Sequence, residues 1–296
     1  MNDRPILKGL ILFLILGGLF FTGIYWLSRL SEGGGPGLGD RIAIVRIEGV
    51  ILDAADTLEE LKRYKDNPSV KAILLRINSP GGAVVPSQEI YEEIKKIKQE
   101  TGKKIIVSMG TVAASGGYYI ASAADKIVAN PGTLTGSIGV IMELMNVEGL
   151  LKKVGLESIV IKSGERKDVG SPFRTMTKSE KDYLQSVMDD VHAQFIEAVV
   201  KGRGLKNEEV VALADGRVFT GRQAMENKLV DELGDLEDAI HVAGKMAGIH
   251  GEPRIIETKK KFSLSDLLKS EFFGNTRLFG LGKTQTPGLN YLWTLE

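Results

Sequence analysis

The sequence contains no cysteine and only three histidines, His192, His241 and His250, among its 296 residues. The absence of cysteine excludes disulfide scaffolds, thiolate metal sites and cysteine nucleophiles. No group of His, Asp and Glu shows the spacing of a metal site, so we predict no metal. The glycine-rich stretches lack the patterns of phosphate-binding and dinucleotide-binding loops, and we therefore predict no cofactor.

An excess of charge of one sign is also missing. Lys and Arg number 38, Asp and Glu number 38, and the formal net charge is +0. No dense basic block interrupts this balance, so we predict no nucleic-acid partner. With 43% hydrophobic and 26% charged residues, the composition is that of a globular protein.

One long stretch near the N-terminus lacks charge altogether. Residues 9–27 are uncharged and end in Tyr25 and Trp26. At ~1.5 Å per residue such a helix approaches the ~30 Å of a bilayer core. No A-x-A cleavage site follows, so we predict an uncleaved transmembrane signal-anchor rather than a removed signal peptide. Arg4 and Lys8 precede the stretch, which weakly favours a single-pass cell-membrane protein with its body outside the cytoplasm.

Composition divides the chain into four parts. We predict an anchor over 1–30, a Gly-rich linker over 31–41, a single globular domain over 42–252, and a C-terminal tail over 253–296. The tail becomes lysine-rich and then rich in Gly, Thr and Asn. This pattern favours a loosely packed tail. The alternative is that the tail binds a membrane surface or a neighbouring subunit.

Strand and helix patterns alternate through the first half of the domain. Short branched apolar runs predict strands at 42–46, 70–77, 104–109 and 126–129. Helical spacing predicts helices at 54–65, 86–100 and 115–124. This order predicts an α/β fold with a mostly parallel sheet, βαβ units and helices on both faces.

The second half is predicted to be mainly helical. A capping-box pattern at 177–180 opens a long helix to about residue 201. The other expected elements are one strand at 156–161 and helices at 147–154, 207–213, 221–227 and 236–247.

Three polar segments follow predicted strands, at residues 78–82, 110–117 and 163–168. Ligands of α/β folds bind at the carboxyl ends of parallel strands, which makes these segments candidates for a site. Ser115 would expose its hydroxyl at the start of a helix, and the Pro-Gly-Gly turn at 80–82 could aim amide N–H groups at an oxyanion. A capping serine and a plain turn would explain the same residues.

A nucleophilic serine needs a base, and the three histidines do not follow any predicted strand. A lysine can take this role where burial favours its neutral amine. Lys167 follows the third strand end, although most lysines are simply exposed. Ser137 lies in a loop of small residues and could orient the amine, unless it serves only the geometry of the loop.

Four blocks, at 78–82, 110–140, 163–174 and 215–234, resemble the signal peptide peptidase A family of the ClpP/crotonase-like superfamily. The resemblance covers roughly residues 40–250. It implies a membrane-anchored serine endopeptidase with a Ser–Lys dyad that degrades signal peptides left in the membrane. It also implies a homo-oligomer with active sites between adjoining subunits.

The resemblance assigns roles to five residues. Ser115 matches the nucleophile, Lys167 the general base and Ser137 the serine that assists it. Gly82 and Gly116 match the residues whose amides form the oxyanion hole. Family members often have an aromatic residue before the lysine, whereas this chain has Arg166. The difference leaves the lysine assignment intact and implies a more polar pocket.

Other functions within the superfamily fit less well. A ClpP-type peptidase needs a histidine about 25 residues after its serine, and residues 135–145 contain none. A crotonase-type acyl-CoA enzyme uses no Ser–Lys pair. NfeD-like proteases acting on stomatin-type membrane proteins usually add C-terminal membrane spans, and no such run follows residue 42. A non-enzymatic membrane scaffold of the same fold is the remaining alternative.

Overall fold

A computed structural model describes residues 16–20, 22, 40–258 and 290–292. The chain divides into two units, 1–39 and 40–296. Within the first unit, residues 16–20 and 22 are helical. Among the residues described, we find no helix with the length and apolarity that a membrane crossing requires. Most of the predicted anchor at 9–27 lies outside the described residues, as does the larger part of the tail.

The centre of the second unit is an eight-stranded sheet. Its long strands are β1 (Arg41–Glu48), β2 (Val70–Ser79) and β4 (Lys104–Ala114), which run parallel to one another. β5 (Lys126–Ala129) and β6 (Leu134–Gly136) both pair with β4, and β6 also pairs antiparallel with β7 (Val218–Thr220). β8 (Glu232–Leu233) pairs with β5. The predicted mostly parallel α/β fold is confirmed.

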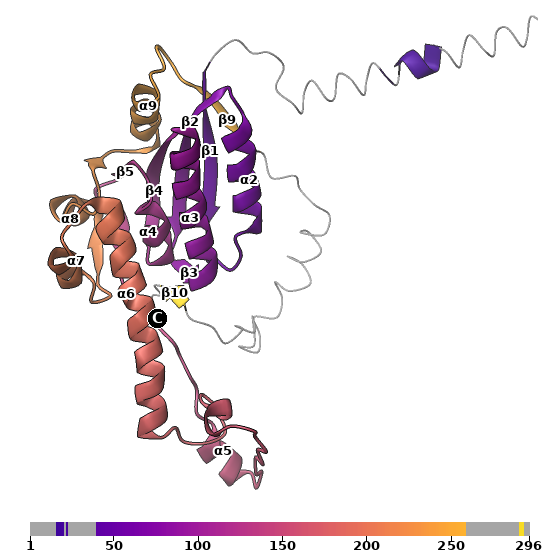
Figure 1. Cartoon of the computed structure of the whole chain (residues 1–296), viewed down its shortest axis with the longest axis vertical. Helices are drawn as coiled ribbons and strands as arrows, with labels where there is room; N and C mark the ends of the chain where they lie inside the picture. Colours follow the sequence, from indigo (N-terminus) through magenta and orange to yellow (C-terminus); the bar gives the residue numbers. More distant parts are fainter. Residues whose placement is uncertain (1–15, 21, 23–39, 259–289, 293–296) are drawn as a thin grey trace, which may run out of the picture. The chain divides into compact units, whose positions relative to one another are not determined.

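Helices cover both faces of this sheet, as the alternating pattern predicts (Figure 1). α2 (Ala55–Asp66), α3 (Val84–Thr101) and α4 (Gly116–Ala121) enclose the larger core on one face. α9 (Leu236–Met246) packs on the other face against residues such as Ile42, Leu74 and Ile106. The strands are buried on both sides, which explains their continuous apolar runs.

A long helix, α6 (Lys178–Arg203), extends well beyond the sheet at one end (Figure 1). It begins with the predicted capping box, in which the Glu180 amide donates to Thr177 Oγ1 over 3.2 Å and the Thr177 amide donates to Glu180 Oε2 over 2.9 Å. Two short helices follow, α7 (Asn207–Leu213) and α8 (Gly221–Glu226). Local sequence therefore predicted the bounds of these helices closely.

The strand predicted at 156–161 is absent from the structure. Its side chains are exposed, and Ile161 is 98% exposed. A branched apolar run favours a strand only where a neighbour supplies hydrogen bonds and packing, and no described strand lies alongside this run. It belongs instead to residues 141–176, which we call the arm. The arm contains α5 (Glu148–Lys153) and the single-turn helix η1 (Glu165–Asp168).

The arm lies at the end of α6 that is remote from the sheet (Figure 1). Its exposed apolar side chains include Met145, Leu150, Leu156, Ile159 and Ile161. Apolar exposure on this scale marks a surface for another protein or for a membrane.

Two strands fall within the predicted C-terminal tail. β9 (Arg254–Glu257) extends the main sheet beside β1. β10 (Asn290–Leu292) pairs antiparallel with β3 (Gly81–Ala83), and these two form a separate small sheet. These two parts of the tail are therefore held by strand pairing.

Candidate active site

Two of the three candidate segments meet at one edge of the sheet. β2 and β4 are neighbours, and their register places Ser79 opposite Ala113. The turn after β2 therefore lies beside Ser115, which follows β4. The third candidate segment, 163–168, does not follow a strand and lies on the arm.

The backbone of Ser115 has an uncommon conformation, with φ 53° and ψ −117°. Its amide donates to the Gly136 carbonyl and its carbonyl accepts from the Tyr119 amide, both over 2.8 Å. A residue held in such a sparsely populated backbone conformation costs on the order of 1–3 kcal/mol and persists only where its surroundings hold it. Here the two hydrogen bonds hold Ser115 between the end of β4 and the start of α4.

Two glycine amides converge beside this hydroxyl. A side-chain carbon built on Gly116 would lie 3.3 Å from the Gly82 amide nitrogen. One built on Gly81, whose φ is +99°, would lie 2.7 Å from the Gly116 amide nitrogen and 3.0 Å from Ser115 Cβ. A larger residue at Gly81 would crowd the Gly116 amide, and one at Gly116 would meet Ser87 Oγ at 2.6 Å. The arrangement suits an oxyanion hole built from the amides of Gly82 and Gly116.

Ser79 supports this turn, although the sequence analysis did not single it out. It is fully buried, and its hydroxyl accepts a hydrogen bond from the Gly81 amide over 3.0 Å. A serine in a turn is too common for its sequence position alone to indicate this role.

Among the described residues, no base lies within hydrogen-bond reach of the Ser115 hydroxyl. Ser115 is 1% exposed, and its Oγ has no hydrogen-bond partner among the described residues. Histidine does not fill the role, because the buried His192 Nε2 is likewise unpartnered. His241 lies on α9 and His250 follows it. A buried, unsatisfied hydroxyl costs about 1–3 kcal/mol, so a missing partner at Ser115 is a feature to explain.

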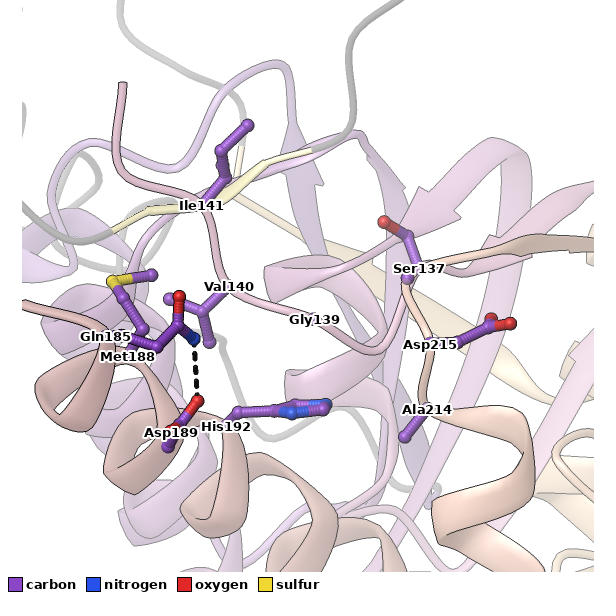
Figure 2. Close-up of a pocket in the computed structure, with 11 residues that line it drawn as sticks. Ser137, Gly139, Val140, Ile141, Gln185, Met188, Asp189, His192, Ala214 and Asp215 are labelled. Atoms are coloured by element: carbon purple, nitrogen blue, oxygen red, sulfur yellow. Dashed lines mark hydrogen bonds between the residues drawn. The ribbon is translucent and has the colours of Figure 1, made fainter. Parts of the chain in front are cut away.

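Ser137 lies close by, at the rim of a cavity of about 430 Å³. It is 7% exposed, has φ 50°, and its amide donates to the Arg217 carbonyl over 2.8 Å. Figure 2 shows Ser137 and Asp215 on one side of this cavity and side chains of α6 on the other, with the His192 ring between them. Because Gly136 binds the Ser115 amide, Ser137 and Ser115 are held in fixed relation.

Lys167 is not brought to Ser115 within one chain. It lies on η1 in the arm with its side chain exposed, and it makes no ion pair with a described residue. Its neighbour Arg166 places its guanidinium over the Tyr183 ring, 4.8 Å from the centroid. The structure therefore collects Ser115, Ser137, Gly82 and Gly116 and leaves Lys167 apart from them.

Charged hydrogen bonds tie the segment around Lys167 to α6. The Arg174 guanidinium donates to Asp168 Oδ2 over 2.8 Å and to Glu180 Oε2 over 2.9 Å. The bond from Arg174 lowers the pKa of Glu180 to about 2, and Arg174 with Lys162 lowers the pKa of Asp168 well below its usual range. Arg174 thus fixes η1 against the first turn of α6.

On the predicted role of Lys167 as the general base, Arg174→Met is expected to lower kcat/KM for peptide hydrolysis by about 10-fold, because Lys167 loses the support of its segment. Labelling of Ser115 by a small reactive probe should stay within twofold, since the serine is remote from this network. Because both carboxyl pKa values are depressed, the network holds above about pH 4.5 and is lost as the pH falls toward 2. Arg174→Lys should restore part of the rate. Equal rates for the parent and Arg174→Met would contradict this role.

Comparisons with known proteins show which family the chain resembles. The profile of peptidase family S49 matches residues 97–250, and that of Clp protease matches residues 44–133. The chain is 43% identical over 232 residues to slr0021 of Synechocystis sp., which is named as a protease, and the match covers 78% of each chain.

Two further relatives have more specific names. A protein of Enterococcus faecium named as a signal peptide peptidase is 39% identical over 213 residues, which is 68% of this chain and 62% of the relative. The chloroplastic serine protease SPPA of Arabidopsis thaliana is 32% identical over 246 residues, which is 77% of this chain and 36% of the relative. The chain therefore belongs to peptidase family S49 and is a serine protease with a ClpP-like α/β domain.

Proposed function

We propose that Ser115 of one copy and Lys167 of an adjoining copy form the catalytic pair of a Ser–Lys endopeptidase. The observation that carries this proposal is the buried Ser115 Oγ, which lies beside two glycine amides and has no partner among the described residues of its own chain. A second copy can supply what is missing, because Lys167 stands on an arm with exposed apolar side chains. Such an arm buries its apolar surface when it packs on a neighbour.

In this mechanism Lys167, as a neutral amine, accepts the proton of Ser115 Oγ while the oxygen attacks the scissile carbonyl carbon. The amides of Gly82 and Gly116 donate to the oxyanion, and Ser137 orients the amine. The C–N bond breaks, the leaving amine takes the proton, and an acyl-enzyme remains. The Lys167 amine then takes a proton from water, whose oxygen attacks the acyl carbon. The acid product leaves, and the proton returns to Ser115 Oγ.

We further propose that the substrates are signal peptides left in the membrane. The uncharged stretch at 9–27 supports this, because a single anchor would hold the protease at the surface where such peptides remain. The weak excess of basic residues before it favours a body outside the cytoplasm. The name of the Enterococcus faecium relative points to the same substrate class.

The proposal is tested with the full chain in detergent micelles and a fluorophosphonate probe, followed by peptide mapping. We expect one labelled residue, Ser115, and hydrolysis of synthetic signal peptides at a rate above that of equally long polar peptides. Pre-treatment with the probe should abolish hydrolysis of both the signal peptides and the polar peptides. Label on another serine would contradict the assigned nucleophile, and equal rates on both peptide classes would contradict the substrate class.

A further inference from the structure

The turn at 215–217 connects α7 to β7 and packs against the loop that carries Ser137. β7 pairs antiparallel with β6, and the Ser137 amide adds one more hydrogen bond beyond β6, to the Arg217 carbonyl over 2.8 Å. A side-chain carbon built on Gly139 would lie 3.3 Å from Gly216 Cα. The turn therefore holds the Ser137 loop at two points.

The backbone of Ser137 needs such support. Its φ is 50°, in the left-handed region that residues other than glycine rarely adopt. A residue in this region persists only where its surroundings hold it. Because the direction of a side chain follows from the backbone, the bond to the Arg217 carbonyl sets the direction of the Ser137 side chain. The preceding residue, Gly136, accepts from the Ser115 amide over 2.8 Å, so one piece of backbone places both serines.

Asp215 and Arg217 close this turn with their side chains. The Arg217 amide donates to Asp215 Oδ1 over 3.1 Å, and the Arg217 Nε donates to the same oxygen over 2.7 Å. Gly216, between them, has a φ of +87°, which glycine adopts without strain. The bonds from Arg217 lower the pKa of Asp215 to about 2, so the carboxylate stays charged at every pH at which a lysine can act as a base.

An ordinary surface ion pair would explain the two side chains alone. The Asp215 side chain is 48% exposed and that of Arg217 is 61% exposed, and ion pairs at such exposure contribute little to stability. It would not explain why the Arg217 carbonyl holds Ser137 in a left-handed conformation. Nor would it explain why Asp215 lines the same cavity as Ser137, on the same side (Figure 2). The pair is therefore better explained by the serine beside it.

Charged and titratable side chains face this cavity from two elements. α6 contributes Asp189 and His192, and the turn contributes Asp215. Asp189 accepts a hydrogen bond from Gln185 over 2.7 Å. Arg217 balances Asp215, so the turn adds no net charge beside the cavity.

The segment around Lys167 has charges of its own. Arg166 precedes the lysine, and Asp168 follows it and is bound by Lys162 and Arg174. These charges stay the same when the turn at 215–217 is altered. A change in the charge of the turn is therefore measured against a constant background.

We propose that Asp215 and Arg217 are positioning residues, whose turn directs the Ser137 hydroxyl and whose opposite charges cancel beside the Lys167 amine of the adjoining copy. This rests on the proposed function for the place of Lys167. A carboxylate alone at this point would favour the charged ammonium, which cannot accept the proton of Ser115. A guanidinium alone would favour the neutral amine. The balanced pair orders the loop without moving the amine toward either form.

The charge is tested by the pH dependence of kcat/KM for a synthetic signal peptide, with the full chain in detergent micelles. Asp215→Asn keeps an oxygen that can accept from Arg217 but removes the negative charge. The amine should then lose its proton more readily, and the acidic limb should move down by about 0.5 pH unit. Arg217→Met leaves the carboxylate alone, and the limb should move up by about as much. Glu232→Gln, which removes a carboxylate paired with Lys126 outside the cavity, should leave the profile unchanged.

Shifts of opposite sign would not arise from a general loss of structure, which favours neither form of the amine. Limbs that coincide with that of the parent, or that move in the same direction, would overturn the cancellation of charge.

The positioning is tested by kcat at saturating substrate and at a pH above the acidic limb. Asp215→Ala removes the acceptor for the Arg217 amide, so the turn loosens, and kcat should fall about tenfold with KM within about twofold. Asp215→Asn should recover most of that loss. In chains that already carry Ser137→Ala, the Asp215→Ala substitution should cost no more than about twofold, because the hydroxyl that the turn directs is absent. An equal effect of Asp215→Ala in both backgrounds would overturn the positioning.

Circular dichroism and thermal unfolding verify that each variant is folded. If Asp215→Ala is unfolded, Asp215→Asn and Arg217→Met still decide through the pH profile, because both keep an acceptor for the amide within the turn.

The result for Lys167→Ala separates this inference from the proposed function. If that variant keeps near-normal turnover, the proposed function is contradicted, and the comparison in the Ser137→Ala background still tests whether the turn acts through Ser137. If that variant is inactive and the profiles of Asp215→Asn and Arg217→Met match the parent, the inference is contradicted and the proposed function stands.

Discussion

Ser115→Ala is expected to reduce peptide hydrolysis by roughly 10⁵-fold or more, because the hydroxyl that forms the acyl-enzyme is removed. The fold should remain, and the variant should be more stable by about 1 kcal/mol, since a buried hydroxyl without a partner is removed. Initial rates on a fluorogenic peptide and urea unfolding measure the two effects. Full activity in the variant would show that another residue is the nucleophile.

Ser115→Gly provides a second, matched variant. It should be equally inactive, and glycine should also relieve the strain of φ 53° at this position. The greater backbone freedom of glycine in the unfolded chain offsets part of that relief. We therefore expect a stability at or somewhat above that of Ser115→Ala. A glycine variant much less stable than the alanine variant would show that the backbone at Ser115 is not strained.

Lys167→Ala is expected to reduce hydrolysis by at least about 10³-fold, because the serine loses its general base. Lys167 is exposed and makes no ion pair with a described residue, so the free energy of unfolding should change by no more than about 0.5 kcal/mol. Rates and urea unfolding of this variant are measured beside those of Lys153→Ala, a control lysine on α5 of the same arm. Near-normal turnover by Lys167→Ala would contradict the Ser–Lys pair.

Mixing the two inactive variants tests whether the pair forms between copies. A Ser115→Ala chain still carries Lys167, and a Lys167→Ala chain still carries Ser115. If copies assemble head to tail at random, about a quarter of the sites join an intact serine to an intact lysine. When the two variants are refolded together, or exchange subunits, the mixture should recover about a quarter of the parent activity. A mixture as inactive as its components would show that both groups come from one chain.

Much of the chain could be predicted because its signals are local. The period of apolar residues located β5 at 126–129 and α7 at 207–213, and the capping box located the start of α6 at Lys178. The parallel order of β1, β2 and β4 follows from alternating strands and helices, and it brings the turn after β2 to Ser115. The positions of Ser115, Gly82 and Gly116 at one edge were therefore predictable without a structure.

Contacts between distant segments were not predictable in the same way. The run at 156–161 has the composition of a strand but has no neighbouring strand among the described residues, and it lies exposed on the arm. The short strands β3 and β10 have no periodic pattern of their own, because three residues cannot show one. Their pairing depends on which segments the fold brings together.

Local sequence patterns are enough to predict the order of strands and helices, the serine and glycine segments at the strand ends, and the lack of cysteine and metal-ligand patterns. These depend on side-chain period, turn residues and composition, which act over a few residues. The folded structure was needed to show that Lys167 lies away from Ser115 in one chain and that the Tyr291 ring is buried against Tyr119. Both depend on packing between residues far apart in the chain, where the hydrogen bonds and apolar contacts of one segment are satisfied by another.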